Sequence, residues 1–282
     1  MKRRSFLTGG AAGVAALTGG AVFEFDPRRE HGADESNGDA IPALGARRLG
    51  QQRLIWSVPT LAPLAALTFD DGPDPEFTPR ILALLASHGV RATFNMMGSN
   101  ALRHPDLVRE IVRAGHELGN HTWTHQDLAF QSARQSNRQL RRAHEAIEGT
   151  AGVRPRFFRP PRGELTGSAL SAAGELGYDV LLWSVTRGDA GVGTPAGVAD
   201  HLAGTVTPGD VVALHDGIGR GTFHPRGAAA RFLRARRSVE VAALPAALER
   251  IEAKGVRLVT VPVLLAAGEG APDHTLTNTR RQ

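Results

Sequence analysis

Short apolar runs alternate with longer amphipathic stretches from residue 63 onward, and this alternation restricts the fold more than any other feature. Such alternation is typical of βα units, whose strands form a parallel sheet or barrel. The 282-residue chain is long enough for one barrel of about 250 residues. The sequence therefore predicts an α/β fold, a distorted (β/α) barrel with about seven parallel strands. The expected strands are 64–69, 92–97, 116–120, 156–159, 179–184, 210–215 and 256–261.

The N-terminus has the features of an export signal. Lys2, Arg3 and Arg4 precede a stretch of small and apolar residues, and the paired arginines before Ser-Phe-Leu resemble a twin-arginine signal. An uncleaved helix or anchor is the alternative. The signal predicts an exported protein, which could be secreted, wall-associated or periplasmic. No later apolar run reaches the roughly 20 residues of a membrane span, so we expect no stable span after cleavage. The expected organisation is a signal peptide over 1–22, a flexible linker over 23–62, a catalytic domain over 63–266 and a tail over 267–282.

Cysteine content and charge exclude some functions. The chain has no cysteine, which rules out a Cys nucleophile and a thiolate metal site. Its formal net charge is +5, and three of the positive charges belong to Lys2, Arg3 and Arg4. The basic character is thus partly a property of the export signal, and we expect no nucleic-acid partner.

Two adjacent carboxylates follow the first strongly apolar strand. Asp70 and Asp71 stand in the string Thr-Phe-Asp-Asp-Gly-Pro, where the Gly-Pro pair turns the chain. Neighbouring side chains point in different directions, so the two acids can have two different roles. An ordinary surface turn is the alternative explanation.

Two histidines have the spacing of a metal-ligand pair. His121 and His125 are separated by i, i+4, which would put both imidazoles on one face of a helical turn. Asp71 would complete a facial set of two imidazoles and one carboxylate, with positions left open for water and substrate. Solvated surface histidines are the alternative.

Two further polar positions follow expected strands. His215 ends an apolar strand, where an imidazole can transfer a proton at neutral pH, or simply bond to the backbone. Arg159 opens the rigid segment Arg-Pro-Pro-Arg-Gly and could aim its guanidinium at a carboxylate. Because reactive side chains in α/β barrels gather where strands end, we expect these groups to converge.

Taken together, these strings resemble the polysaccharide deacetylase family, which includes chitin and peptidoglycan deacetylases and some acetylxylan esterases. The resemblance covers roughly residues 64–265 and depends most on Thr-Phe-Asp-Asp-Gly-Pro and His-Thr-Trp-Thr-His. It implies hydrolysis of N-acetyl groups on an extracellular or cell-wall glycan of the peptidoglycan or chitin type. It also implies a divalent metal, Zn²⁺ first, with Co²⁺ or another first-row ion as alternatives.

The resemblance also implies a role for each residue that matches the family's motifs. Asp71, His121 and His125 would bind the metal. Asp70 would be the general base, and Arg159 would orient it. His215 would be the general acid. Leu214 would line a pocket for the acetyl methyl, and the backbone N–H of Arg162 would donate to the oxyanion.

The sequence departs from the family in its fourth motif. Family members often show Asp-x-x-Asp-Trp, whereas this chain has Thr186, Asp189 and Ala190 at those positions. If Asp189 is the carboxylate that tunes His215, the acid is intact; otherwise the acid has lost its partner. Arg162 also replaces a usual Tyr. An O-acetyl, xylan-type esterase and a non-catalytic glycan-binding homologue are therefore the alternative functions.

A basic segment precedes the last expected helix, 240–254. Its arginines extend from Arg220 to Arg237, and no acidic residue follows until Glu240. We expect a loop there, inserted over 218–239. Such a loop could bind an anionic wall polymer, or it could be a solvated face of the protein.

Overall fold

The computed structural model describes residues 52–188, 191, 193–219 and 227–268. The chain divides into a unit of residues 1–46 and a unit of residues 47–282, and the fold below belongs to the second unit. The expected signal peptide, residues 23–51 of the linker and most of the tail lie outside the described residues. Within the described ranges, no helix is both long and apolar enough to cross a membrane.

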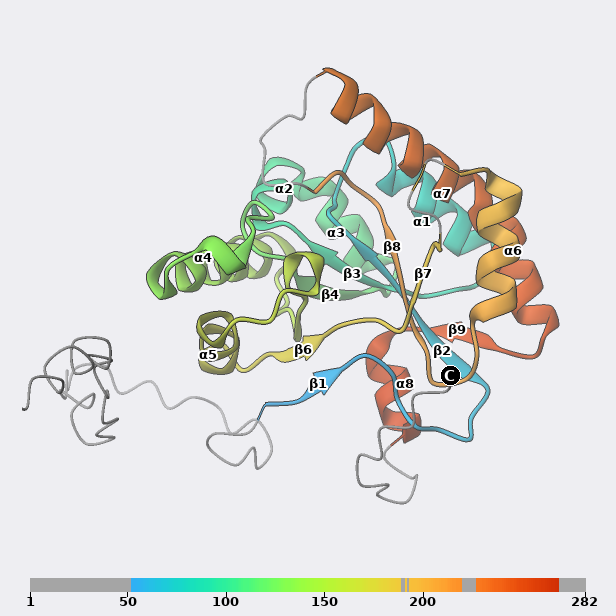
Figure 1. Cartoon of the computed structure of the whole chain (residues 1–282), viewed down its shortest axis with the longest axis horizontal. Coiled ribbons are helices and arrows are strands. Elements are labelled where there is room, and N and C mark those ends of the chain that lie inside the picture. The colour runs from blue at the N-terminus through green and yellow to red at the C-terminus, as the bar shows by residue number, and fades with distance from the viewer. Residues whose placement is uncertain (1–51, 189–190, 192, 220–226, 269–282) are drawn as a thin grey trace, which may run out of the picture. The chain divides into compact units, whose positions relative to one another are not determined.

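The described residues form one sheet in which every ladder is parallel. Its strand order is β1-β6-β5-β4-β3-β2-β8-β7, and β9 pairs with β2 (Figure 1). The predicted α/β distorted barrel is confirmed. The strands are β1 (Leu54–Ile55), β2 (Leu64–Asp70), β3 (Thr93–Met96), β4 (Glu117–Asn120), β5 (Phe157–Phe158), β6 (Asp179–Leu181), β7 (Val185–Thr186), β8 (Val211–His215) and β9 (Arg257–Val259).

Strands β1 and β7 add to the seven that we expected. Each has two residues, too few for an alternating pattern to be recognised in the sequence. β1 lies within the range for which we expected a linker, so the sheet begins before residue 63. Just after β1, Ser57 forms an antiparallel bridge with Asp210, which precedes β8. This bridge brings the first strand toward the opposite half of the sheet.

Strand β2 is the centre of the sheet. All seven of its residues are buried, as expected for a strand covered on both faces. Its first half pairs with β9, and its second half pairs with β3 on one edge and β8 on the other. Asp70 is therefore in register with both Asn95 and His215. The parallel register thus places three polar side chains at one end of neighbouring strands.

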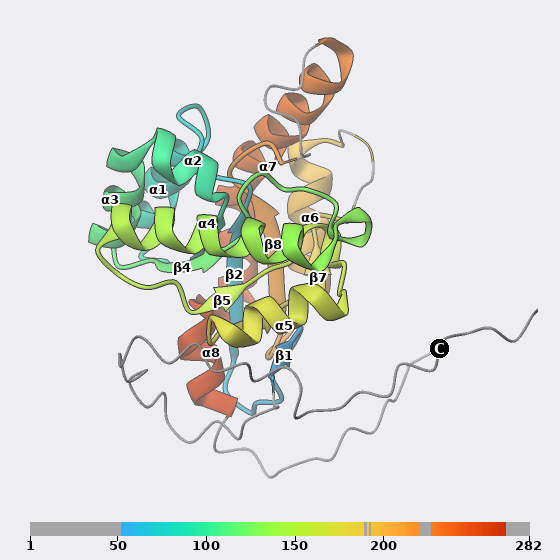
Figure 2. The same cartoon turned by 90° about the vertical axis from the view of Figure 1, so that its left-hand side faces the viewer.

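The helices lie between the strands along the chain. α4 and α5 pack together on one side of the sheet, and α6 packs with α7 on another (Figures 1 and 2). α4 begins with a capping box at Ser132 and ends at Gly152, whose φ is 70°. The bounds are α1 (Thr78–Ser87), α2 (Gly98–Arg103), α3 (Pro105–Arg113), α4 (Ala133–Ala151), α5 (Gly167–Glu175), α6 (Pro195–Thr205), α7 (Gly227–Ala253) and α8 (Val261–Gly268), with 3₁₀ turns η1 (Leu128–Phe130) and η2 (Pro161–Gly163).

Helix α7 corrects the expected loop over 218–239. Residues 227–239 are helical, and α7 continues to Ala253 with Pro245 inside it. Its first turns are rich in Ala and Arg, which are strong helix formers. The concentration of charge favoured a loop, but helix propensity and the burial of Leu233 and Arg237 favour a helix. Residues 220–226 lie outside the described ranges.

Candidate metal centre and catalytic groups

The Asp-Asp-Gly string turns sharply at the end of β2. Asp70 is the last strand residue, and Asp71 has a φ of 80°, a left-handed conformation that is uncommon for residues other than Gly. The N–H of Gly72 donates to Asp216 Oδ1 over 3.1 Å. A Cβ on Gly72 would lie 2.0 Å from the Asp216 carboxylate, so only glycine fits there. This turn separates the directions of the two carboxylates.

Asp71, His121 and His125 come together as a buried group. The Nε2 atoms of both histidines lie 3.5 Å from Asp71 Oδ1, and the three potential ligand atoms lie within 4.8 Å of one another. Asp71 Oδ1 is buried and has no hydrogen-bond partner among the described residues, as expected of an oxygen that binds a cation. Two imidazoles and one carboxylate suit Zn²⁺ and other first-row divalent ions. The donor set therefore fits a metal.

An irregular loop after β4 (Glu117–Asn120) carries the two histidines. Thr122 and His125 both have positive φ values, 66° and 55°, so residues 121–125 do not form the helical turn that the spacing suggested. His121 Nδ1 lies 2.7 Å from the carbonyl oxygen of Arg159, which directs Nε2 toward Asp71. Thr122 Oγ1 accepts from the His125 backbone N–H over 3.0 Å. A hydrogen bond to a distant backbone carbonyl thus orients the His121 ring, and a local one fixes the backbone at His125.

The protonation states of this group determine how it can bind a metal. Burial alone would raise the pKa of the Asp71 carboxyl, but His125, His121 and other neighbouring groups hold that pKa well below its usual value. Burial lowers the pKa of His125 to about 4, although the Asp71 charge opposes this shift. The Asp70 and Asp71 carboxylates raise the pKa of His121 against the effect of its burial. A divalent ion requires an ionised carboxylate and neutral imidazoles, so it would displace the proton that these carboxylates favour on His121.

Asp70 is held by the arginine that the sequence singled out. Arg159 is fully buried, and its Nη1 donates to Asp70 Oδ1 over 2.8 Å. Asn95 Nδ2 donates to the same oxygen over 2.8 Å. Burial raises the pKa of Asp70, but Arg159, His121 and neighbouring donors outweigh it, and the resulting pKa lies below the usual value. Asn95 was not singled out from the sequence; its register beside Asp70 was the available signal.

His215 has a carboxylate partner that the sequence analysis did not identify. Its backbone N–H donates to Glu240 Oε2 over 2.9 Å, and its Nδ1 lies 3.3 Å from the same oxygen. Glu240 belongs to α7, whereas we had considered Asp189 for this role. Asp189 lies outside the described residues. The sequence signal for Glu240 was its position as the first acid after the basic segment.

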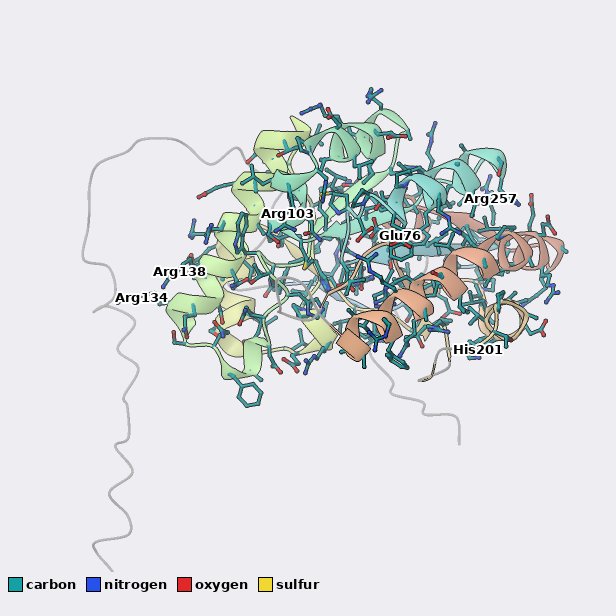
Figure 3. All side chains as sticks on the ribbon, turned by 90° about the horizontal axis from the view of Figure 1, so that it is seen from above. Glu76, Arg103, Arg134, Arg138, His201 and Arg257 are labelled. Carbon is teal, nitrogen blue, oxygen red and sulfur yellow. The ribbon has the colours of Figure 1, made fainter. Side chains whose placement is uncertain are left out.

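Arg237 connects the two parts of the site. It is buried and donates from Nη1 to Glu240 Oε1 over 2.9 Å and from Nη2 to Asp71 Oδ2 over 3.2 Å. We had grouped Arg237 with a basic loop that could hold an anionic polymer, but it forms internal ion pairs. Arg234 pairs with Glu76, which lies beside α7 (Figure 3). The described part of this segment thus gives no support to an anionic-polymer site.

A cavity of about 360 Å³ opens in front of these groups. Ala213 and His215 on β8 line it, whereas Leu214 lies 1% exposed in the core, because neighbouring strand residues face opposite ways. The acetyl pocket expected at Leu214 therefore does not match this cavity. Arg162 lines the cavity and pairs with Asp127 over 3.0 Å. Its other lining residues are Asp70, Asp71, His121, His125, Trp183, Thr186, Gly219, Leu233, Arg236 and Arg237.

Comparisons with known proteins show which family the sequence resembles. The sequence model described as polysaccharide deacetylase matches residues 57–181. The chain is 37% identical over 198 residues to a peptidoglycan-N-acetylglucosamine deacetylase of Bacillus cereus, covering 70% of this chain and 66% of that relative. It is also 37% identical over 172 residues to a chitooligosaccharide deacetylase of Sinorhizobium fredii, covering 61% of this chain and 80% of that relative.

A solved structure gives the same result for the fold. The crystal structure of the Bc1960 peptidoglycan N-acetylglucosamine deacetylase, in complex with a hydroxamate-type benzamide, superposes with a TM-score of 0.67 at 33% identity. The match covers 76% of this chain and 92% of that chain. With the sequence matches and the Asp-His-His group, it follows that the chain belongs to the polysaccharide deacetylase family of hydrolases.

Proposed function

We propose that this protein removes N-acetyl groups from a peptidoglycan- or chitin-type polymer of N-acetylglucosamine. The observation that carries the proposal is the buried Asp71–His121–His125 group at a cavity whose wall also contains Asp70 and His215. The cavity thus joins a metal-ligand set to two groups that can move protons. The names of the relatives support the same chemistry for this chain.

Asp70 is the proposed general base. Its carboxylate stays ionised because Arg159 and Asn95 stabilise the negative charge on Oδ1. It lines the cavity and can accept a proton from the attacking water. A divalent ion held by Asp71, His121 and His125, with Zn²⁺ first and Co²⁺ or another first-row ion as alternatives, would supply Lewis acidity.

His215 is the proposed general acid. It lines the cavity, and its Nδ1 faces Glu240, so its Nε2 is the atom available to the leaving amine. An amide nitrogen is a poor leaving group unless it is protonated, and general acid catalysis contributes about 10²–10⁴-fold to such steps. The backbone N–H of Arg162 remains the proposed donor to the oxyanion, in a segment where Arg162 has a φ of 56°.

We also propose that the protein acts outside the cytoplasm. The paired arginines and the apolar stretch before residue 23 support export by the twin-arginine route. A glycan of the cell envelope is the substrate that agrees with this location.

Acetate release from peptidoglycan, chitin oligomers and acetylxylan tests the proposal. We expect release from at least one N-acetylated glycan, loss of release with a chelator, and recovery after addition of Zn²⁺ or Co²⁺. Asp70→Asn serves as the inactive control, because it removes the base but keeps the side-chain size. No release from any substrate, together with no bound metal, would refute the proposal.

The esterase alternative depends on a weakened acid. An alkoxide leaves more readily than an amine, so an O-acetyl esterase would tolerate a histidine without a carboxylate partner. His215 has such a partner in Glu240, and this contact favours the amidase. Faster release from acetylxylan than from either N-acetylated glycan would favour the esterase instead.

A further inference from the structure

The geometry points to Glu240 as the residue that positions His215 for proton transfer, acting from helix α7 in a chain that has Thr at position 186. This inference rests on the proposed function, because it assigns a partner to the proposed acid. Glu240 acts through His215 and does not itself reach the substrate: its side chain is 2% exposed, whereas that of His215 is 29% exposed.

One carboxylate oxygen fixes both the backbone and the ring of His215. Glu240 Oε2 accepts from the His215 N–H over 2.9 Å and lies 3.3 Å from Nδ1. A carboxylate can only accept, so this contact places a proton on Nδ1. The ring is thereby held with Nε2 facing the cavity that His215 lines. When His215 acts as the acid, the ring is an imidazolium with a proton on each nitrogen, and the proton on Nε2 passes to the leaving amine. The same arrangement of carboxylate and imidazole orients the histidine of a serine-protease triad.

The other carboxylate oxygen is held by arginine. Arg237 Nη1 donates to Glu240 Oε1 over 2.9 Å, and Arg187 Nε lies 3.8 Å from the same oxygen. Burial raises the pKa of Glu240, but His215, Arg237 and Arg187 outweigh it and leave that pKa below its usual value. Glu240 therefore carries a negative charge next to the imidazole. The two buried guanidinium groups stabilise this charge in the protein interior.

Position 186 lacks the carboxylate that is often found in the family's fourth motif. Thr186 is in register with Ala213 on β8, two residues before His215, and lines the same cavity. Residues two apart on a strand face the same side, so a carboxylate at 186 would point toward the His215 side of β8. This chain instead supplies the carboxylate from α7. Glu240 and Arg237 are three residues apart on that helix, which puts them on one face.

The first test compares leaving groups in Glu240→Gln. We expect kcat for an N-acetylated chitin oligomer to fall about 10²-fold or more, since Gln keeps the shape but can present an N–H to Nδ1. Hydrolysis of p-nitrophenyl acetate should fall less than about 10-fold, because phenolate leaves without a proton. KM and bound metal should not change. Glu249→Gln is the matched control, since Glu249 is an exposed side chain on the same helix.

A double-mutant cycle tests whether Glu240 acts through His215. In a His215→Ala background, Glu240→Gln should cost almost nothing further in amide turnover. If Glu240→Gln lowered amide turnover by the same factor in the His215→Ala background as in the parent, the inference would be overturned. Amide turnover within about threefold of the parent in the single variant, or equal losses on amide and ester substrates, would also overturn it.

A second measurement depends neither on activity nor on the folding of Glu240→Gln. Long-range ¹H–¹⁵N spectra of the metal-free parent, with the His215 signals assigned by comparison with His215→Ala, report which ring nitrogen carries the proton. At a pH where the ring is neutral we expect its proton on Nδ1; a neutral ring with its proton on Nε2 would overturn the inference. If the parent shows the Nδ1–H form but deacetylates no glycan, the proposed function fails while the positioning of His215 by Glu240 stands.

Discussion

The metal half of the site and the acid half are built differently. Asp71 follows β2 (Leu64–Asp70), and His121 and His125 share one five-residue string, within which the His125 N–H donates to Thr122 Oγ1. His215 depends on Glu240, which lies 25 residues further along the chain and on another element. Short sequence strings thus contain all the residues of the metal half, whereas the partner of the acid is identified only in the tertiary fold.

The largest effect is expected in the metal half. Asp71→Ala removes the carboxylate that faces both histidines, and we expect loss of bound metal and a fall in deacetylation of about 10³-fold or more, since the Lewis acid contributes several kcal/mol. Metal content by mass spectrometry and acetate release measure this. Asp106→Ala, at an exposed site, is the control. Full metal occupancy in Asp71→Ala would contradict the separation of the two halves.

The acid half should respond according to the leaving group. His215→Ala should lower amide turnover by about 10²–10⁴-fold, because the amine then leaves without a proton. Turnover of an O-acetylated xylan should fall much less, and bound metal should be unchanged. Steady-state kinetics on both substrates measure the difference. Similar small losses on both would identify the protein as an esterase rather than an amidase.

Arg237 tests the link between the two halves. Arg237→Met leaves the buried carboxylates of Asp71 and Glu240 without this cation, and such a change typically lowers the free energy of unfolding by about 3–5 kcal/mol. Chemical denaturation of the metal-free protein measures it. A divalent ion should reduce the loss, since it neutralises Asp71. Arg234→Met is the matched control on the same helix, because its exposed pair with Glu76 should contribute only about 0–1 kcal/mol.

His116 gives the smallest effect and lies outside both halves. Burial, with Arg91 nearby, lowers its pKa from 6.5 to about 4. As the pH falls, the unfolded chain therefore takes up this proton before the folded chain does. The contribution of neutral His116 to the free energy of unfolding is complete above pH 6.5 and is lost as the pH falls toward 4. His116→Asn should reduce the loss of stability between pH 7 and pH 5, measured by denaturation of the metal-free protein. An identical slope would show that other groups cause the acid sensitivity.

Most of the metal half could be predicted from the sequence. Asp71, His121 and His125 lie in short strings at strand ends, and the parallel register does bring those ends together. The expected local conformation was wrong, because a loop with positive φ values, and not a helical turn, joins His121 to His125. Leu214 could have been placed correctly from the twofold alternation of a strand, which turns it away from His215.

The partners of the acid could not be predicted in the same way. Arg237 looked like part of a basic loop and Glu240 like the first residue of the next helix. Their contacts are to residues far along the chain. The packing of α7 against α6 and β8 sets which face of the helix is buried, and that face is a property of the tertiary structure. The short strands β1 and β7 were missed for a simpler reason, namely their length.

Helix α7 also restricts how this protein can diverge. One residue inserted or deleted between Arg237 and the part of the helix packed on α6 would turn Arg237 by about 100° around the axis. The guanidinium would then leave Asp71, even if every amino acid in the site were retained. Chain length within α7 should therefore tolerate less variation than its amino-acid identity, so that gaps in an alignment, rather than substitutions, would mark relatives that have lost this link.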